Sequence, residues 1–228
     1  MISLDVFQNL LRNKQDLIDK ALNQDPKAIG LEGKELESLA LAGTLFISLF
    51  GLTVGMKHSV LQAVASAIKL PVLFMITSII CFPTLYIFQA LLGMQTSIRQ
   101  LFSFMLLCLA ISGVILLSFI PVSVFFLIAG TDYEVFKIIN VGILAIAGSS
   151  GLYVFRKYLL RKMKDQQDTT YYHKFKLMMN AWFLLFGCIG SNLGFIISPV
   201  FGMKNEPFIF FTTSNENFFS HVFNILIH

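Results

Sequence analysis

Charged residues are scarce in this sequence. Asp, Glu, Lys and Arg make up 13% of the 228 residues, whereas they make up about 25% of a typical soluble domain. Hydrophobic residues reach 56%, and the mean hydropathy is +0.74. This composition excludes an ordinary soluble domain and indicates an integral membrane protein. At this length we expect one compact bundle of membrane helices and no second globular domain.

Motifs for catalysis are lacking as well. The sequence contains no H-E-x-x-H, no glycine-rich phosphate loop and no G-x-S-x-G. The uncharged cores of the predicted spans contain no ionisable residue, and such residues usually mark proton relays and ion-coupled transport. We therefore expect neither an enzyme nor a coupled pump, with no catalytic residues and no cofactor.

Cysteine is rare too, and its spacing fits none of the usual cysteine sites. Cys81, Cys108 and Cys188 each lie in an apolar run without a C-x-x-C pair, so we interpret them as small buried hydrophobic residues. His221 and His228 have no carboxylate or cysteine in step with them, so we expect no metal site. The first 38 residues are polar and of mixed charge, which predicts no cleavable signal peptide.

What the sequence does contain is five apolar segments, and a bilayer core of about 30 Å needs about 20 helical residues. The predicted fold is therefore all-α, an integral membrane bundle of about five transmembrane helices with amphipathic surface helices at both ends. The predicted spans are about residues 39–56, 70–93, 100–128, 138–155 and 177–201, within a membrane domain of residues 39–203. Residues 1–38 are expected to form a cytoplasmic amphipathic helix and a polar linker, and residues 204–228 an extracytoplasmic aromatic amphipathic tail.

A short amphipathic stretch, residues 58–69, lies before the second span. Its apolar residues fall on one face of a helix, which predicts a second surface-lying helix between the first two spans. Pro71 would then open the second span, where a proline does no harm. The apolar face of this stretch consists of Val60, Leu61, Val64 and Ile68.

Two prolines lie in the middle of predicted spans. Pro83 and Pro121 each remove one backbone hydrogen bond and should kink the second and third spans. Paired kinks can serve as a hinge or open a cavity, or they can be fixed bends that shape the bundle. Because no ionisable residue lies beside either proline, we favour the fixed bend.

Small residues recur at helical spacing in three spans. In a bilayer, close van der Waals contact between helices replaces the hydrophobic effect, and small-xxx-small patterns allow that approach. Gly51 and Gly55 form such a pair, although a chance occurrence in a glycine-tolerant span explains them equally well. The helix-packing residues predicted in this way are Gly51, Gly55, Gly142, Gly148, Gly187, Gly190 and Gly194.

Aromatic residues supply candidate anchors at the membrane–water interface. The C-terminal tail begins with Ser214 as a cap and then separates phenylalanines from polar residues at helical spacing, so it should lie in the interface. A tryptophan near the start of the fifth span fits the same role. The predicted interfacial anchors are Trp182, Phe218, Phe219 and Phe223.

Lys and Arg are distributed unevenly between the two sides of the predicted bundle. With five spans, thirteen of the Lys and Arg residues lie on one side of the membrane, in the N-terminal tail, at Arg99 and in residues 156–176. The other four lie on the opposite side. By the positive-inside rule the N-terminus faces the cytoplasm and the C-terminus lies outside. The basic residues adjoin apolar spans rather than aromatics that could stack on bases, so nucleic acid is not an expected partner.

The hairpin of the second and third spans carries a family resemblance. Its order is Lys69-Leu70-Pro71, a proline-bearing span, Leu92-Gly93, and then Ser97-Ile98-Arg99-Gln100-Leu101 before a long apolar span. This order resembles the five-span Yip1-type membrane domain, in which a polar S-x-R-Q-like turn joins two spans. It is also similar to bacterial five-span proteins whose outer tails are rich in Pro-Phe and Asn-Phe-Phe, as at residues 207–208 and 217–219 here. The resemblance covers roughly residues 40–223 and implies a non-enzymatic bundle that works through other membrane proteins.

Two functions stay open at this point. The first is a non-catalytic scaffold, subunit or assembly factor in a bacterial inner membrane, whose partners are the lipid bilayer and other membrane proteins or further copies of itself. The second is a passive channel or transporter with a polar path at the proline-bearing spans. An enzyme acting on lipids is the least favoured, because no set of acid, base and nucleophile can be named. The polar path would be lined by Thr77, Ser78, Gln89, Asn140 and Asn192.

Overall fold

The computed structural model describes residues 33–91, 97–166 and 169–202, and these residues form five α-helices without a strand among them. They are α3 (Gly33–Gly55), α4 (Val60–Leu91), α5 (Ile98–Ile128), α6 (Tyr133–Gln166) and α7 (Thr169–Ile196). All five are long and apolar enough to cross a bilayer. The predicted all-α membrane bundle is thereby confirmed, and the chain is a multipass integral membrane protein. The predicted amphipathic helices at both ends, with Phe218, Phe219 and Phe223, lie outside the described residues.

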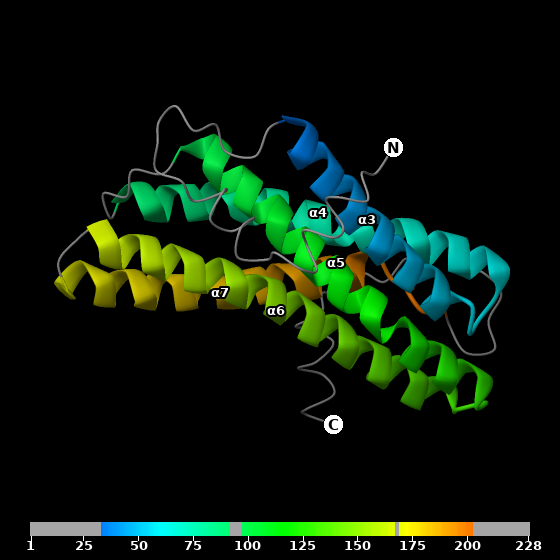
Figure 1. Ribbon diagram of the computed structural model, residues 1–228. Coiled ribbons are helices and arrows are strands. Elements are labelled where there is room, and N and C mark those ends of the chain that lie inside the picture. The colour runs from blue at the N-terminus through cyan, green and yellow to red at the C-terminus, as the bar shows by residue number, and fades with distance from the viewer. Residues whose placement is uncertain (1–32, 92–96, 167–168, 203–228) are drawn as a thin grey trace, which may run out of the picture.

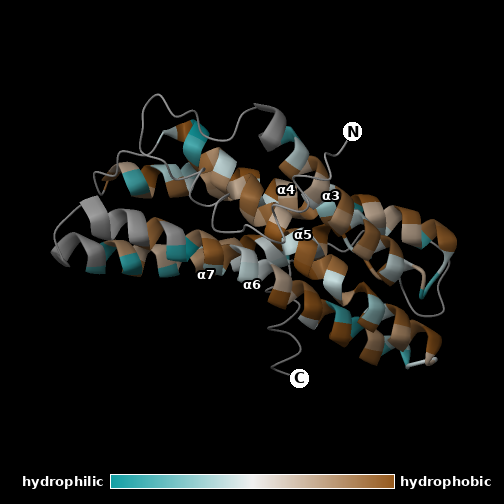
Figure 2. Ribbon diagram, in the orientation of Figure 1, coloured by the Kyte–Doolittle hydropathy of each residue, from teal (hydrophilic) through white to brown (hydrophobic). Residues whose placement is uncertain are grey.

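The five helices run back and forth along one another (Figure 1). α3 packs against α4 and α5, α6 packs against α5, and α7 packs against α4 and α6. Hydrophobic residues cover most of the helix length, with hydrophilic residues concentrated toward the helix ends (Figure 2). We call the end where α4 ends, α5 begins, α6 ends and α7 begins the basic end. We call the end that holds the α3–α4 and α5–α6 loops the far end.

α4 is longer than predicted. It starts at Val60 and continues through Pro71 to Leu91, so residues 60–69 form one helix with the second span rather than a separate helix, and Pro71 lies inside that helix rather than at its start. Ser59 explains the start, because its hydroxyl accepts a hydrogen bond from the Gln62 backbone N–H at 3.1 Å, as an N-cap does. The 32 residues span about 48 Å, which exceeds a hydrocarbon core of about 30 Å. Part of α4 therefore projects beyond the core.

α5 begins at a capping box. The Ser97 hydroxyl accepts a hydrogen bond from the Gln100 backbone N–H, and the Gln100 side chain accepts one from the Ser97 backbone N–H, both at 3.2 Å. This reciprocal pair satisfies two donors that a helix start leaves unpaired. The polar Ser-x-Arg-Gln turn of the hairpin thus has a local structural role, which is to start α5 two residues before the predicted boundary.

Pro83 and Pro121 lie inside helices that continue on both sides of them. Both prolines are on exposed faces of the bundle. Neither lines the cavity described below, so this cavity does not support the interpretation that the two prolines open one.

Trp182 does not lie at an interface as predicted. It is 1% exposed and stacks on Phe155 of α6, with the ring centroids 5.5 Å apart. Its indole N–H donates to the Cys81 carbonyl of α4 at 3.1 Å. A buried carbonyl therefore takes the place of the water or headgroup that an interfacial tryptophan would bind. The side chain joins α4, α6 and α7 near the basic end.

α7 also ends earlier than predicted, at Ile196 rather than near Phe201. Residues 198–202 are not helical, and we call them the returning segment. The Ser198–Pro199 peptide bond is cis. Val200 and Phe201 are each 9% exposed and pack in the core of the far end with Phe50, Leu70 and Phe136.

Candidate functional site

The polar side chains of α4 point into the bundle and its apolar side chains point out. The inward face carries Gln62, Ser66, Lys69, Thr77 and Gln89, all 3% exposed or less. The outward face carries large aliphatic residues along the whole helix, among them Val60, Leu61, Val64, Ile68, Ile79, Ile80, Ile87 and Leu91. The amphipathic pattern predicted for residues 58–69 is real, but its apolar face is turned to the outside of a transmembrane helix.

The polar face of α4 holds the returning segment at the far end. Gln62 Nε2 donates to the Pro199 carbonyl at 2.9 Å and to the Val200 carbonyl at 3.2 Å. The Ser66 hydroxyl donates to the Val200 carbonyl, and Lys69 Nζ donates to the Pro199 carbonyl at 3.1 Å. The Tyr133 hydroxyl of α6 donates to the Phe201 carbonyl at 2.7 Å. We call these four side chains, Gln62, Ser66, Lys69 and Tyr133, the carbonyl clamp.

The carbonyl clamp supplies hydrogen-bond donors to backbone carbonyls that a non-helical segment would otherwise leave unpaired inside a membrane protein. An unpaired carbonyl in an apolar environment costs several kcal/mol, so irregular backbone at membrane depth needs protein partners. The carbonyls of Pro199, Val200 and Phe201 all have such partners. The segment ends at Gly202, a position that requires glycine. Its φ is +89°, and a Cβ there would lie 2.6 Å from Cγ of His58.

Lys69, which the sequence analysis placed just before the second span, is an ionisable residue inside the helix that is long and apolar enough to cross the bilayer. It lies inside α4 and is 3% exposed. At 1.5 Å per residue, Lys69 is about 14 Å along the helix from Val60. Because α4 exceeds the hydrocarbon core by about 18 Å, a centred helix places Lys69 just inside the core boundary. Its ammonium group donates to the Pro199 carbonyl of the returning segment, and this contact helps to hold the non-helical backbone there.

Several predicted glycines do lie at helix contacts. A Cβ built on Gly51 would lie 2.5 Å from the Ser66 carbonyl oxygen, and one on Gly55 would lie 2.6 Å from Cα of Ala63. Both positions bring α3 against the backbone of α4. Gly148, Gly190 and Gly194 have looser contacts, with the nearest atoms 3.6–3.9 Å away.

Gly142 and Gly187 have open space around them, with no atom of another helix within 4 Å of a built Cβ. Among the described residues they contact no other helix of this chain, and their role as helix-packing residues stays a prediction. Gly43 and Gly113 were not predicted to pack helices, yet they face each other across α3 and α5, where a Cβ on Gly113 would lie 2.9 Å from the Gly43 carbonyl oxygen. The available signal was a third glycine in the first span and the one glycine of the third span.

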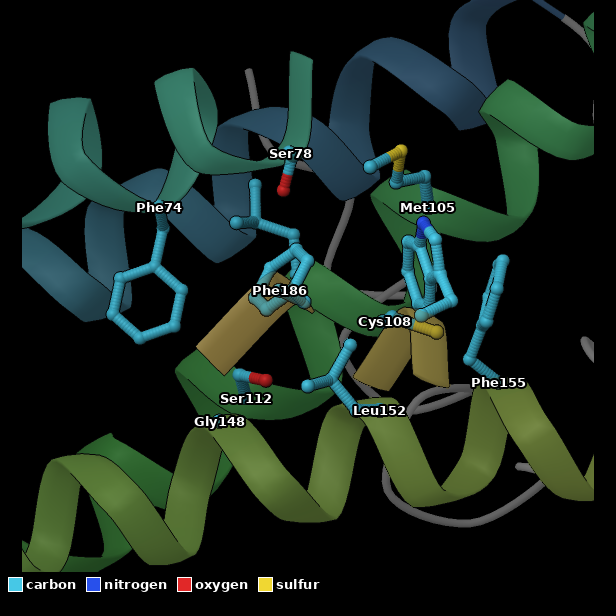
Figure 3. A pocket seen from close by; sticks show the side chains of 11 residues that line it. Phe74, Ser78, Met105, Cys108, Ser112, Gly148, Leu152, Phe155 and Phe186 are labelled. Atoms are coloured by element: carbon cyan, nitrogen blue, oxygen red, sulfur yellow. The ribbon is translucent and has the colours of Figure 1, made fainter. Parts of the chain in front are cut away.

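A small cavity lies between α4, α5, α6 and α7 (Figure 3). Its volume is about 30 Å³, which accommodates one or two water molecules but no organic ligand. Ser78 and Ser112 place hydroxyl groups at a lining that is otherwise apolar and aromatic, including Phe74, Phe155 and Trp182. In this state the cavity fits bound water rather than a transported solute.

The residues proposed for a polar path do not share one lining. Thr77, Asn140 and Asn192 each donate a hydrogen bond to the backbone carbonyl four residues earlier on their own helix, at 2.7, 2.8 and 3.1 Å. Asn140 also accepts from the Ser123 hydroxyl of α5. Of the five, Ser78 lines the cavity. Gln89 is 2% exposed, and both polar atoms of its amide are buried without a hydrogen-bond partner.

α7 differs from the other helices in how little of it is buried. Only 11% of its span is buried, against 50% for the α5 span. Its outward face follows a spacing of three and four residues and mixes small, polar and aliphatic side chains, namely Leu177, Asn180, Ala181, Leu184, Gly187 and Ser191. We call these six residues the α7 outer face. Its composition contrasts with the outward face of α4, which consists mainly of large aliphatic residues.

Comparison of the chain with protein-family models, with curated proteins and with solved structures finds no match. The resemblance to the Yip1-type domain therefore stays a prediction.

Proposed function

We propose that this chain is a non-enzymatic multipass membrane protein that acts as a scaffold, subunit or assembly factor of a membrane complex. In this proposal the α7 outer face binds a helix of another membrane protein or of a second copy. The proposed location is a bacterial inner membrane, in line with the resemblance to bacterial five-span proteins. The positive-inside distribution of Lys and Arg supports an N-terminus in the cytoplasm.

The contrast between the outward faces of α4 and α7 carries this proposal. Lipid tails are best matched by large aliphatic side chains, as on α4. Helix association in a bilayer depends instead on small residues that let backbones approach and on amides and hydroxyls that bond across the contact. Asn180, Gly187 and Ser191 supply both on one exposed face. An exposed asparagine within a span is costly against lipid and favourable against a polar partner.

A crosslinking experiment tests the proposal. A photo-crosslinking amino acid is placed at Leu184 or Ser191 of the α7 outer face, and, as matched controls, at Ile79 or Ile87 of α4, which are comparably exposed. In native membranes we expect a protein adduct of defined mass from the two α7 positions and none from the α4 positions. Replacing Asn180 and Gly187 by leucine should lower the adduct yield about tenfold, since such contacts contribute about 1–2 kcal/mol.

The opposite result is equally clear. If the α7 positions give no protein adduct, or give the same adducts as α4, the α7 outer face is a lipid-facing surface and the proposal fails. An adduct with twice the mass of the chain identifies self-association, whereas any other defined mass identifies a different partner.

A further inference from the structure

The cavity between α4, α5, α6 and α7 lies near the middle of the bundle. Ser78, Ser112 and Gly148 line it from the middle parts of α4, α5 and α6. α4 and α5 follow each other in the chain, but they are held together mainly through α3, α6 and α7, which pack against them. A small molecule bound in the cavity can therefore add a link between α4 and α5.

Two hydroxyl groups of the lining point into this cavity. Ser and Thr in helices often donate to a backbone carbonyl of their own helix, and six hydroxyls of the spans donate to the carbonyl four residues earlier, namely Thr44, Thr53, Thr77, Ser103, Ser118 and Ser150. No such bond is observed for Ser78 or Ser112, nor any other hydrogen bond of their hydroxyls to a residue that the structure describes. Both hydroxyls turn toward the cavity instead (Figure 3). Ser112 is 4% exposed, so the partner of its hydroxyl has to lie inside the cavity.

We propose that one or two water molecules bound in this cavity join the Ser78 hydroxyl of α4 to the Ser112 hydroxyl of α5. The cavity volume of about 30 Å³ suits that number, and an internal water makes hydrogen bonds to about two to four polar groups. The two hydroxyls supply two of them. The Cys108 carbonyl oxygen is a further acceptor next to the Ser112 hydroxyl, since both oxygens lie within 2.8 Å of a Cβ built on Gly151.

Such a bridge stabilises the bundle at a depth where unpaired polar groups are costly. Lipid tails cannot satisfy a hydroxyl, whereas a bridging water bonds nearly as well as a direct partner. The rest of the lining is apolar or aromatic, and its partly exposed members, Phe74, Leu152 and Phe186, lie between the cavity and the lipid. The bound water is therefore a fixed part of the helix packing, and it gives α4 and α5 a polar link that an apolar core lacks.

The test uses the full chain in lipid nanodiscs. A short X-ray pulse splits water into hydroxyl radicals, which oxidise side chains beside a bound water even where bulk solvent does not reach. Cys108 and Cys81 form a matched pair, because both are buried free thiols on consecutive helices and Cys81 does not line the cavity. We expect Cys108 to be oxidised in the wild type while Cys81 stays nearly unmodified, as measured by mass spectrometry of the peptides.

Variants connect the water to the two hydroxyls. The double variant Ser78→Ala/Ser112→Ala should lose the oxidation of Cys108, down to the rate of Cys81. Ser103→Ala is the matched control on α5, because its hydroxyl donates to the Arg99 carbonyl at 2.9 Å, and it should leave the rate of Cys108 unchanged.

A second variant reduces the space for water and keeps both hydroxyls. In Gly148→Ala the added methyl group has room, since the nearest atom of another helix is Cε1 of Phe74 at 3.9 Å, and it should lower the oxidation of Cys108. Circular dichroism checks that each variant is helical, and Gly148→Ala keeps the test available if the double serine variant does not fold.

Three results would overturn the inference. In the first, Cys108 of the wild type is oxidised no faster than Cys81, which means that no water lies beside it. In the second, the double serine variant is oxidised at Cys108 like the wild type, which means that the two hydroxyls do not hold the water. In the third, Ser103→Ala lowers the rate as much as the double variant does, which means that the effect is not specific to the cavity.

Discussion

Replacing Gly51 by alanine is expected to destabilise the bundle by about 1–3 kcal/mol, as overpacking a tight contact does. The added methyl group would lie 2.5 Å from the Ser66 carbonyl oxygen. That neighbour is backbone and cannot rotate away, so α3 and α4 must separate to accept it. Gly55→Ala should act in the same way, because its Cβ would lie 2.6 Å from Cα of Ala63.

The same replacement at Gly142 is the matched control and is expected to have the opposite sign. Gly142 lies inside α6 with open space around it. Alanine there loses less backbone entropy on folding and should stabilise the isolated protein by up to about 1 kcal/mol. The measurement is the free energy of unfolding of each variant in mixed micelles titrated with a denaturing detergent. Equal effects at Gly51 and Gly142 would contradict the helix contacts described here.

Replacing both Gln62 and Ser66, which donate to the Val200 carbonyl, is expected to lower the free energy of unfolding by more than the sum of the two single replacements. In Gln62→Leu the carbonyl still accepts from Ser66, and in Ser66→Ala it still accepts from Gln62. The double variant leaves a buried carbonyl without either side-chain partner. We expect an additional penalty of about 1–3 kcal/mol, the cost of an unsatisfied buried polar group.

The returning segment gives this double-mutant cycle a local readout. A cysteine at Val200, which is 9% exposed in the wild type, should react slowly with a water-soluble maleimide. Labelling should stay slow in both single variants and become fast in the double variant. Additive stability changes with unchanged labelling would show that the carbonyl clamp does not hold the segment.

The number of spans could be predicted from the sequence, because apolar length alone determines it. The contact of Gly51 and Gly55 with α4 agrees with the small-xxx-small pattern, which allows two helices to approach closely. The presence of small residues at helical spacing did not distinguish these two glycines from Gly142 and Gly187. A glycine shows that close approach is allowed, while the partner helix is determined by the tertiary fold. Gly142 of α6 and Gly187 of α7 therefore had the same sequence signal and lie on an outer surface.

The carbonyl clamp was not predicted. The periodicity of apolar residues shows that a helix has two different faces, but it does not show which face points to lipid or water and which points into the protein. Residues 58–69 were interpreted as a surface helix from their apolar face alone, and Gln62, Ser66 and Lys69, which lie off that face, form the inward side of α4. The spacing of these three residues, directly before an apolar span, was the signal that could have found them. Their partners are carbonyls more than 100 residues away in the sequence, and no local pattern specifies such contacts.

The burial of Trp182 could not be predicted from the local sequence either. The sequence places a tryptophan near a span end, which is typical of an interfacial anchor. Its partners, the Cys81 carbonyl and the Phe155 ring, come from two other helices. Only the packing of α4, α6 and α7 together makes a buried position favourable for its N–H.

The role described for the carbonyl clamp requires that α4 crosses the membrane from Val60 onward with its polar face inward. Spin labels at Val64, Ile68 and Met75, which all lie on its exposed face, report membrane depth through their relative collision rates with oxygen and a water-soluble nickel complex. A transmembrane α4 predicts that depth increases by about 6 Å from Val64 to Ile68 and by about 10 Å more to Met75, less any tilt. Equal depth at Val64 and Ile68, with a step only after Pro71, would mean that residues 58–69 lie on the membrane surface and would contradict the carbonyl clamp.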